Sequence, residues 1–214
     1  RYPGGEDEEG ADRALHERAA ELKADGKIPY VIPLAPGHKP LGALGYVLAA
    51  GELLDQARGL GITIDSVVLA TGSGSTHAGL LAGLRAGGSR AKVYGFCVRR
   101  DRQTQGERVA GRLTEVARMI GAEDAVAGEE VWVDDSVLGP GYGQLTEGAM
   151  EAIGLAARLD GILLDPTYTG KAMAGLIGLV CSGELGAGER CVFLHTGGTP
   201  ALFGYPELTA GSGA

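Results

Sequence analysis

The chain has 214 residues, a formal net charge of −8 and a hydrophobic content of 44%. This composition predicts a globular protein with one substantial core, and the acidic balance excludes a basic face for nucleic acid. No apolar run reaches the roughly 18 residues of a membrane span and no signal-peptide pattern opens the chain, so we expect a cytoplasmic protein without a membrane partner. The three cysteines match no zinc-binding spacing, and we expect no metal site.

Predicted helices and strands alternate along the chain. Apolar residues that recur every three to four positions indicate helices, and short apolar or β-branched runs between turns indicate strands. In chain order the predictions are helix 13–25, strand 28–34, helix 41–61, strand 65–70, helix 77–88, strand 91–98, helix 104–120, strand 130–135, helix 146–161, strand 162–165, helix 169–183 and strand 191–196. Because parallel strands need crossover connections, this alternation predicts an α/β fold with a mostly parallel, wound sheet and helices on both faces.

The sharpest motif is the segment GSGST, which joins a predicted buried strand directly to a predicted helix. Glycines permit positive φ and close approach of a ligand, while successive N–H groups at a helix N-terminus attract anions. An ordinary glycine-rich turn is the alternative. Neither the Walker A pattern nor the Rossmann spacing is present, so the segment predicts a phosphate-binding loop of another kind. That loop consists of Gly72, Ser73, Gly74, Ser75 and Thr76.

Several stretches resemble one enzyme family. TGSGSTHAG is similar to the phosphate loop of fold type II enzymes that use pyridoxal 5'-phosphate (PLP). ILLDPTYTGKAMAGL, FLHTGGTPALFGY and PLGALGYV resemble the branch that holds D-cysteine desulfhydrase and 1-aminocyclopropane-1-carboxylate (ACC) deaminase. The resemblance covers residues 28–205, and Ser75 departs from it because the family usually has glycine there.

The resemblance implies a tryptophan-synthase-β-like fold, PLP as cofactor, a small amino-acid substrate and a homodimer. It also implies that residues 1–27 end a small domain or form a connecting helix. Residues 28–214 would then form the C-terminal part of the large PLP-binding domain.

The resemblance further implies roles for four side chains. Tyr142 and Tyr168 match two active-site tyrosines that handle protons or orient the substrate. Thr169 matches the position that faces the pyridine nitrogen, where ACC deaminases have glutamate, and Thr196 matches a position where they have leucine. A packed tyrosine and a threonine that caps a helix or turn remain the alternatives. The two threonines imply α,β-elimination of D-cysteine to pyruvate, ammonia and hydrogen sulfide.

The cofactor of this family is held covalently by a lysine in a segment that this sequence does not match. The lysines present all lack that context: Lys23, Lys27, Lys39, Lys92 and Lys171. We therefore expect the C-terminal part of a longer enzyme, inactive when alone, with Lys171 pointing to solvent or paired with an acid. The alternatives are an ACC deaminase, an L-cysteate sulfo-lyase or a catalytically inactive PLP-binding protein.

Two histidines lie beside these motifs. His77 follows the predicted phosphate loop, where it either supports the anion site as a cation or packs at the helix start. His195 lies at the end of a predicted strand, and we expect it to be a hydrogen-bonded structural residue.

Overall fold

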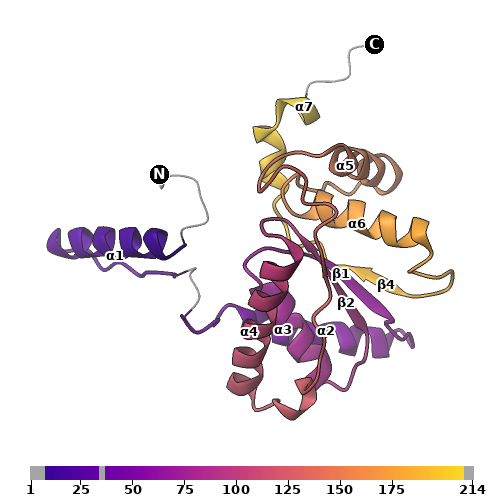
Figure 1. Ribbon diagram of the computed structural model, residues 1–214, viewed down its shortest axis with the longest axis horizontal. Coiled ribbons are helices and arrows are strands. Elements are labelled where there is room, and N and C mark those ends of the chain that lie inside the picture. The colour runs from indigo at the N-terminus through magenta and orange to yellow at the C-terminus, as the bar shows by residue number, and fades with distance from the viewer. Residues whose placement is uncertain (1–7, 34–36, 210–214) are drawn as a thin grey trace. The chain divides into compact units, whose positions relative to one another are not determined.

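The computed structural model describes residues 8–33 and 37–209 (Figure 1). The chain divides into two compact units, and the boundary between them falls at Lys39 and Pro40. In the described ranges, no helix is long and apolar enough to cross a membrane.

The first unit contains helix α1, Glu8–Ala24, where the sequence predicts a helix over 13–25. The strand predicted for 28–34 is wrong for residues 28–33, which form neither strand nor helix, and Leu34 lies outside the described residues. The side chains of Ile28, Tyr30 and Ile32 are exposed. A strand needs a neighbour for its backbone N–H and C=O groups, and the described part of this unit contains no second strand. The assignment of residues 1–27 to a small domain stays a prediction.

The second unit is built on a parallel sheet. Its described strands are β1 Ser66–Thr71, β2 Lys92–Cys97, β3 Val133–Asp134 and β4 Cys191–Phe193. Their order across the sheet is β3-β2-β1-β4, and every neighbouring pair is parallel. The predicted α/β class with a parallel sheet is therefore confirmed.

Helices cover both faces of this sheet (Figure 1). The described helices of this unit are α2 Ala43–Gly59, α3 Ser75–Ala86, α4 Arg102–Ile120, α5 Glu147–Asp160, α6 Thr169–Ser182 and α7 Pro206–Thr209, with short 3-10 turns at Asp124–Val126 and Thr199–Gly204. Helices α2, α3 and α4 pack on one face, and α6 packs on the other, where α5 lies against it. Each of the helices α1 to α6 thus overlaps the range that the sequence predicts for it.

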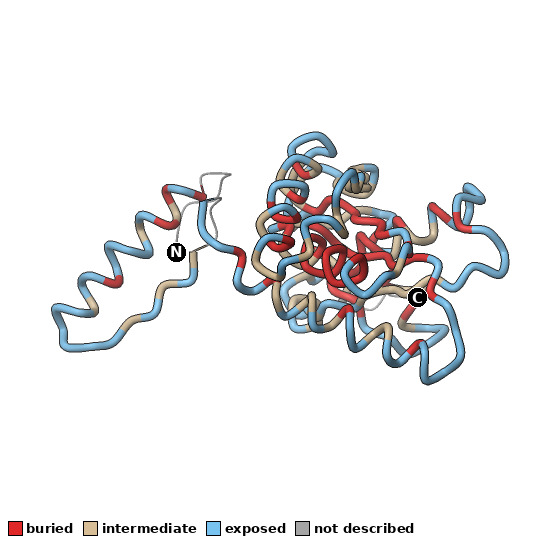
Figure 2. The backbone as a smooth tube through the Cα atoms, turned by 90° about the horizontal axis from the view of Figure 1, so that it is seen from below, coloured by how far each residue is buried: buried red, intermediate tan, exposed pale blue. Residues whose placement is uncertain are grey.

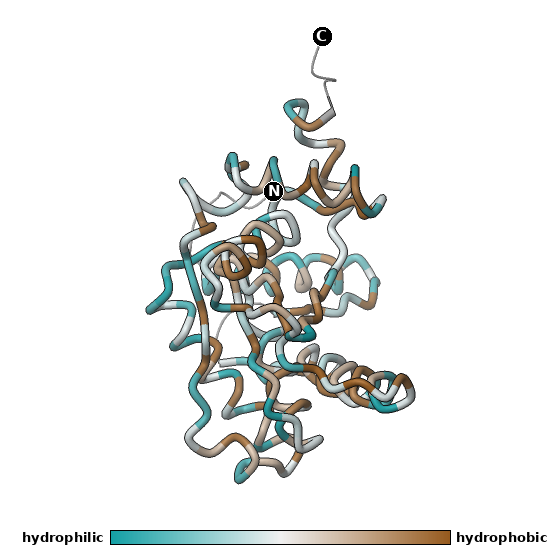
Figure 3. The backbone as a smooth tube through the Cα atoms, turned by 90° about the vertical axis from the view of Figure 1, so that its right-hand side faces the viewer, coloured by the Kyte–Doolittle hydropathy of each residue, from teal (hydrophilic) through white to brown (hydrophobic). Residues whose placement is uncertain are grey.

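Side chains of β1 alternate between two buried clusters. Val67 and Leu69 join the cluster beneath α2, α3 and α4, whereas Val68 and Ala70 join the cluster beneath α6. The buried residues follow the sheet and its flanking helices (Figure 2), and hydrophobic and hydrophilic residues alternate along those helices (Figure 3). A strand that is buried on both faces is typical of a parallel sheet, and it explains the continuous apolar run at this position.

Three predicted strands of this unit differ from the structure. The one at 130–135 shortens to the two residues of β3, the one at 191–196 shortens to the three residues of β4, and the one at 162–165 is absent although Leu164 is fully buried. The Leu163 carbonyl accepts hydrogen bonds from the His195 ring and the Thr199 hydroxyl, at 3.0 and 3.3 Å. Side chains therefore satisfy a backbone group that a strand would pair with its neighbour.

Candidate active site

The loops that follow β1 and β4 meet at the carboxyl end of the sheet. β1 leads into α3 on one face, whereas β4 is preceded by α6 on the opposite face. Open α/β sheets bind ligands at such points, where neighbouring strands connect to opposite faces. A cavity of about 250 Å³ lies here, between residues 70–74, Thr76, His77, Tyr46, Tyr168 and residues 196–198.

The predicted phosphate loop forms one wall of this cavity. Gly74 has φ +84°, a conformation that glycine adopts without strain, and α3 begins at the next residue. A side chain at Gly74 would also stand 3.4 Å from the Val109 side chain. Gly72, Ser73, Gly74 and Thr76 line the cavity, while Ser75 is not among its lining residues. The N-terminus of α3 therefore faces the cavity with the positive end of its dipole.

Two arginines, which the sequence analysis did not single out, hold the phosphate loop from behind. Arg100 donates to the Gly72 carbonyl at 3.0 Å, and Arg108 donates to the Ser73 carbonyl at 2.8 Å. Both come from the segment after β2, about 30 residues downstream of the loop. Because guanidinium groups take these carbonyl oxygens, the oxygens do not repel an anion at the loop, and of its N–H groups that of Ser75 is bonded to the Ser73 hydroxyl at 3.4 Å. The positive charge of the guanidinium groups adds to the attraction for an anion.

His77 lies in the first turn of α3 and lines the cavity, although its side chain is fully buried. Its ring packs over Gly95 of β2, where any side chain would collide with it. Burial lowers the pKa of His77 to about 4, so the ring is neutral at pH 7 and the cationic role considered from the sequence is not supported. Neither ring nitrogen has a hydrogen-bond partner among the described atoms. The ring therefore forms part of the cavity wall as a neutral group, with both nitrogens buried away from the cavity surface.

Tyr168 and Tyr142 come together although 26 residues separate them in sequence. Their hydroxyl groups are hydrogen-bonded, and their rings pack edge to face with centroids 5.9 Å apart. Tyr168 lines the cavity, whereas Tyr142 lies behind it, 48% exposed, with the Arg99 guanidinium 5.6 Å from its ring centroid. Burial, and then the hydrogen bond with Tyr142, raise the pKa of Tyr168 above its ordinary value. The Tyr168 hydroxyl therefore keeps its proton at neutral pH.

Asp165 anchors the start of α6, a role that the sequence analysis did not anticipate. Its buried carboxylate accepts the Tyr168 and Thr169 N–H groups at 2.9 and 2.8 Å, and the Thr169 hydroxyl at 2.7 Å. Thr169 is buried and is not among the residues that line the cavity. Its hydroxyl thus belongs to a capping network in this structure, and contact with a pyridine nitrogen stays a prediction.

The loop after β4 forms the opposite wall. Thr196 is exposed and lines the cavity, as its assignment to the substrate side requires. His195 donates through Nε2 to the Leu163 carbonyl, and its Nδ1 accepts the Gly197 N–H at 3.1 Å. This geometry confirms that His195 is a hydrogen-bonded structural residue.

Lys171 differs most from its prediction. Its side chain is completely buried, and its ammonium group donates to the carbonyls of Leu138 and Gly141 at 2.7 and 3.1 Å. The expectation that it points to solvent or pairs with an acid is therefore wrong, because carbonyl oxygens that are remote in sequence hold it. Within the described ranges, no lysine lines the cavity. The donor set thus fits the phosphate end of PLP, and the described wall offers no amine to its aldehyde.

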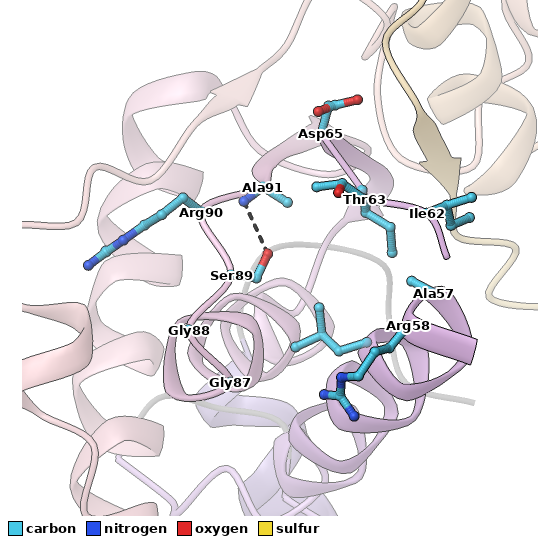
Figure 4. Close-up of a pocket in the computed structure, with 12 residues that line it drawn as sticks. Ala57, Arg58, Ile62, Thr63, Asp65, Gly87, Gly88, Ser89, Arg90 and Ala91 are labelled. Carbon is cyan, nitrogen blue, oxygen red and sulfur yellow. Dashed lines mark hydrogen bonds between the residues drawn. The ribbon is translucent and has the colours of Figure 1, made fainter. Parts of the chain in front are cut away.

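A larger cavity, of about 590 Å³, lies at the amino end of the sheet (Figure 4). Two of its charged groups are engaged elsewhere: Arg58 bonds Asp55 at 2.7 Å, and Asp65 accepts the Arg190 N–H at 2.8 Å. The side chains of Asp65 and Arg90 extend in different directions rather than toward a common point. The described residues around this cavity therefore lack the converging polar groups that mark a binding site.

Comparison with known proteins agrees with this geometry. Residues 3–197 match the family model described as "Pyridoxal-phosphate dependent enzyme". A crystal structure of an ACC deaminase homologue is 36% identical with a TM-score of 0.82, and the match covers 98% of this chain and 62% of that one.

Two more distant structures share the fold alone. A threonine deaminase from T.th. is 20% identical with a TM-score of 0.55, over 91% of this chain and 72% of that one. A mutant O-ureido-L-serine synthase with O-ureido-L-serine bound is 14% identical with a TM-score of 0.60, over 99% and 60%. The resemblance derived from the sequence motifs is confirmed: the chain belongs to the family of pyridoxal-phosphate-dependent enzymes with the tryptophan-synthase-β-like fold.

Proposed function

We propose that the protein acts as a PLP-dependent lyase that converts D-cysteine to pyruvate, ammonia and hydrogen sulfide. The observation that carries this proposal is a single cavity that combines the phosphate loop with Tyr168 and Thr196. The chain spans 62% of the length of the ACC deaminase homologue, so the activity belongs to the proposal for the whole protein.

The backbone N–H groups of residues 72–76 would hold the cofactor phosphate. Three features support this role: the N-terminus of α3, the positive φ of Gly74, and the two arginines that occupy the loop carbonyls. When bound, PLP supplies an electron sink for the negative charge that develops at the substrate Cα. A covalent link to the cofactor would require a lysine that the described cavity wall of this chain does not provide.

Tyr168 is the residue best suited to handle a proton. Its hydroxyl is at the cavity wall, and its raised pKa means that the group donates rather than accepts a proton near neutral pH. Expulsion of sulfide from D-cysteine places negative charge on sulfur, and a phenol donor next to the leaving group would stabilise it. Tyr142 would orient this hydroxyl through the hydrogen bond between the two tyrosines.

The preference for D-cysteine over ACC is proposed mainly on Thr196. A hydroxyl at this wall offers a polar contact to a thiol-bearing substrate and removes the apolar surface that the cyclopropane of ACC would pack against. Thr169 supports the same choice less directly, because its hydroxyl is engaged with Asp165. For that hydroxyl to reach a pyridine nitrogen, the capping network at the start of α6 would have to rearrange.

The decisive experiment measures three products from the full-length protein supplied with PLP. Sulfide from D-cysteine, 2-oxobutyrate from ACC and sulfite from L-cysteate separate the three candidate lyase activities. We expect the highest kcat/KM with D-cysteine, and Thr196→Leu should shift the ratio toward ACC by about 10-fold. A higher kcat/KM with ACC in the unmodified protein would contradict the proposal.

A second candidate is a protein that binds PLP or another phosphate without catalysis. It would follow if the full-length protein, like the described cavity wall, offered no lysine to the cofactor. A PLP titration and the three product assays together distinguish the two candidates. Saturable PLP binding with no turnover of any of the three amino acids indicates the second.

A further inference from the structure

The loop between β3 and α5 carries Tyr142 but has almost no regular structure of its own. Gly139, Gly141 and Gly143 all have positive φ, and the loop contains neither helix nor strand over residues 135–146. Such a loop samples many conformations unless side chains from elsewhere hold it. Backbone hydrogen bonds inside the loop, among them one from the Gln144 N–H to the Gly141 carbonyl at 3.2 Å, shape its turns, whereas the placement of Tyr142 against Tyr168 depends on contacts that come from outside the loop.

Lys171 provides the strongest of these contacts. It lies in the first turn of α6, three residues after Tyr168, and its ammonium group bonds the carbonyls of Leu138 and Gly141. Tyr205 provides a second contact, because its hydroxyl donates to the Gly143 carbonyl at 2.7 Å. The two contacts fall on either side of Tyr142. The same helix start that presents Tyr168 to the cavity thus also holds the loop that brings Tyr142 to it.

Complete burial of an ammonium group costs free energy of desolvation that an apolar side chain would not cost. The pKa of Lys171 is lowered by burial, and the charge has carbonyl oxygens rather than a carboxylate as its hydrogen-bond partners. Even a buried ion pair can often be replaced by apolar side chains of similar volume without loss of stability. Packing alone would therefore favour methionine or leucine, whereas fixing two carbonyls at one point requires several donors on one atom.

We propose that Lys171 is a positioning residue that fixes the Tyr142 loop and so holds the Tyr142 hydroxyl against Tyr168. This inference rests on the proposed function only for its effect on turnover. The contact between the two tyrosines is a property of the fold and can be measured without substrate.

The first test follows amide hydrogen exchange in the full-length protein and in Lys171→Met. We expect exchange at residues 139 and 141–143 to speed up by about 10-fold or more, because two charge-assisted hydrogen bonds are lost. Lys92→Met is the matched control, since Lys92 is an exposed lysine at the start of β2, and it should leave these amides unchanged. Wild-type exchange in Lys171→Met would overturn the proposal. This readout stands even if the D-cysteine assay fails.

The second test is a double-mutant cycle of Lys171→Met and Tyr142→Phe, read as kcat on the substrate that the full-length enzyme prefers. If Lys171 acts through Tyr142, the double variant loses no more activity than the more damaging single variant. Losses that multiply would show that Lys171 acts independently of Tyr142, and would overturn the proposal.

Tyr205→Phe covers the case in which Lys171→Met does not fold, because it loosens the loop and leaves α6 untouched. It should speed exchange at residues 141–143 and lower kcat in the same non-additive way with Tyr142→Phe. Faster exchange with unchanged kcat would mean that holding the loop does not place Tyr142 for turnover. That result would also overturn the proposal.

Discussion

The two ends of the parallel sheet carry cavities that differ in size and in what surrounds them. At the amino end the cavity is about 590 Å³, and charged side chains at its wall are engaged with residues beside it. At the carboxyl end it is about 250 Å³, and a helix N-terminus, a tyrosine and a buried histidine without a partner among the described atoms converge on it. Polar groups that converge, rather than volume, thus distinguish the candidate site.

A partly buried ion pair stabilises the amino end of the sheet. Arg85, at the end of α3, forms a two-pronged ion pair with Glu129, with both contacts at 2.6 Å, and also donates to the carbonyls of Ser89 and Ala91. These contacts close the turn between α3 and β2. Changes at this end should therefore alter stability, and changes at the carboxyl end should alter ligand binding and turnover.

The largest expected effect is at the carboxyl end. Tyr168→Phe removes the hydroxyl that faces the cavity, and we expect kcat of the full-length enzyme to fall by about 10²- to 10⁴-fold. PLP affinity, measured by fluorescence titration, should change little because the phosphate loop is intact. An equal loss of affinity and turnover would assign Tyr168 to cofactor binding instead.

At the amino end, Glu129→Ala should lower the free energy of unfolding by about 3–5 kcal/mol, because it leaves a buried guanidinium without its counter-charge. Urea denaturation measures this loss, and PLP affinity should not change. Glu115→Ala is the matched control: its partner Arg112 is 3.4 Å away and the Glu115 side chain is 40% exposed, so the loss should stay below about 1 kcal/mol. Weakened PLP binding in Glu129→Ala would break the separation of the two ends.

His77 predicts a pH dependence at the carboxyl end. Its pKa is about 4 in the folded chain against 6.5 ordinarily, so between these values the unfolded chain binds a proton that the folded chain does not. The free energy of unfolding should therefore fall as pH drops from 6.5 to 4, by about 3 kcal/mol from this residue. Denaturation at several pH values should show a smaller fall in His77→Asn than in wild type. The control variant is His195→Asn, which replaces an exposed histidine and should show the wild-type fall. An equal fall in wild type and His77→Asn would contradict the burial argument.

The smallest expected effect compares two glycines with positive φ. Gly74, in the phosphate loop, has φ +84°, and Gly88, at the amino-end cavity, has φ +77° with open space around it. Alanine should strain the backbone at both by about 1–2 kcal/mol. Only Gly74→Ala should also weaken binding of inorganic phosphate and PLP, by about 10-fold. Equal affinities in the two variants would argue against the loop as the phosphate site.

Local sequence patterns predicted much of this molecule. The apolar periodicity of α4 and the continuous apolar run of β1 are properties of a few adjacent residues, and both elements appear where those patterns place them. The turn of the predicted phosphate loop into α3 was predictable for the same reason, because its glycines act on their own backbone, whereas phosphate binding there stays a prediction. Family resemblance added Tyr142 and Tyr168, which the fold brings into contact.

The errors concern interactions between residues that are distant in sequence. Residues 28–33 have the composition of a strand, but composition does not supply a neighbouring strand. Lys171 looks like a surface residue until carbonyls 30 and 33 positions away enclose its ammonium. In sequence, Arg100 is an ordinary cation before a helix and Arg108 an ordinary cation within it, and their role depends on where the predicted phosphate loop turns its carbonyls.

The hydrogen bonds from Arg100 and Arg108 to the predicted phosphate loop link ligand binding to the cooperativity of folding. The loop and the two arginines belong to consecutive strand–helix units, β1–α3 and β2–α4, so an anion held by the loop favours the state in which both units are docked. A ligand that binds only the native state stabilises it by an amount that grows with the logarithm of ligand concentration once that exceeds the Kd. The cost of opening α4 should therefore rise with phosphate concentration, although the residues that line the cavity in the described structure include none from α4.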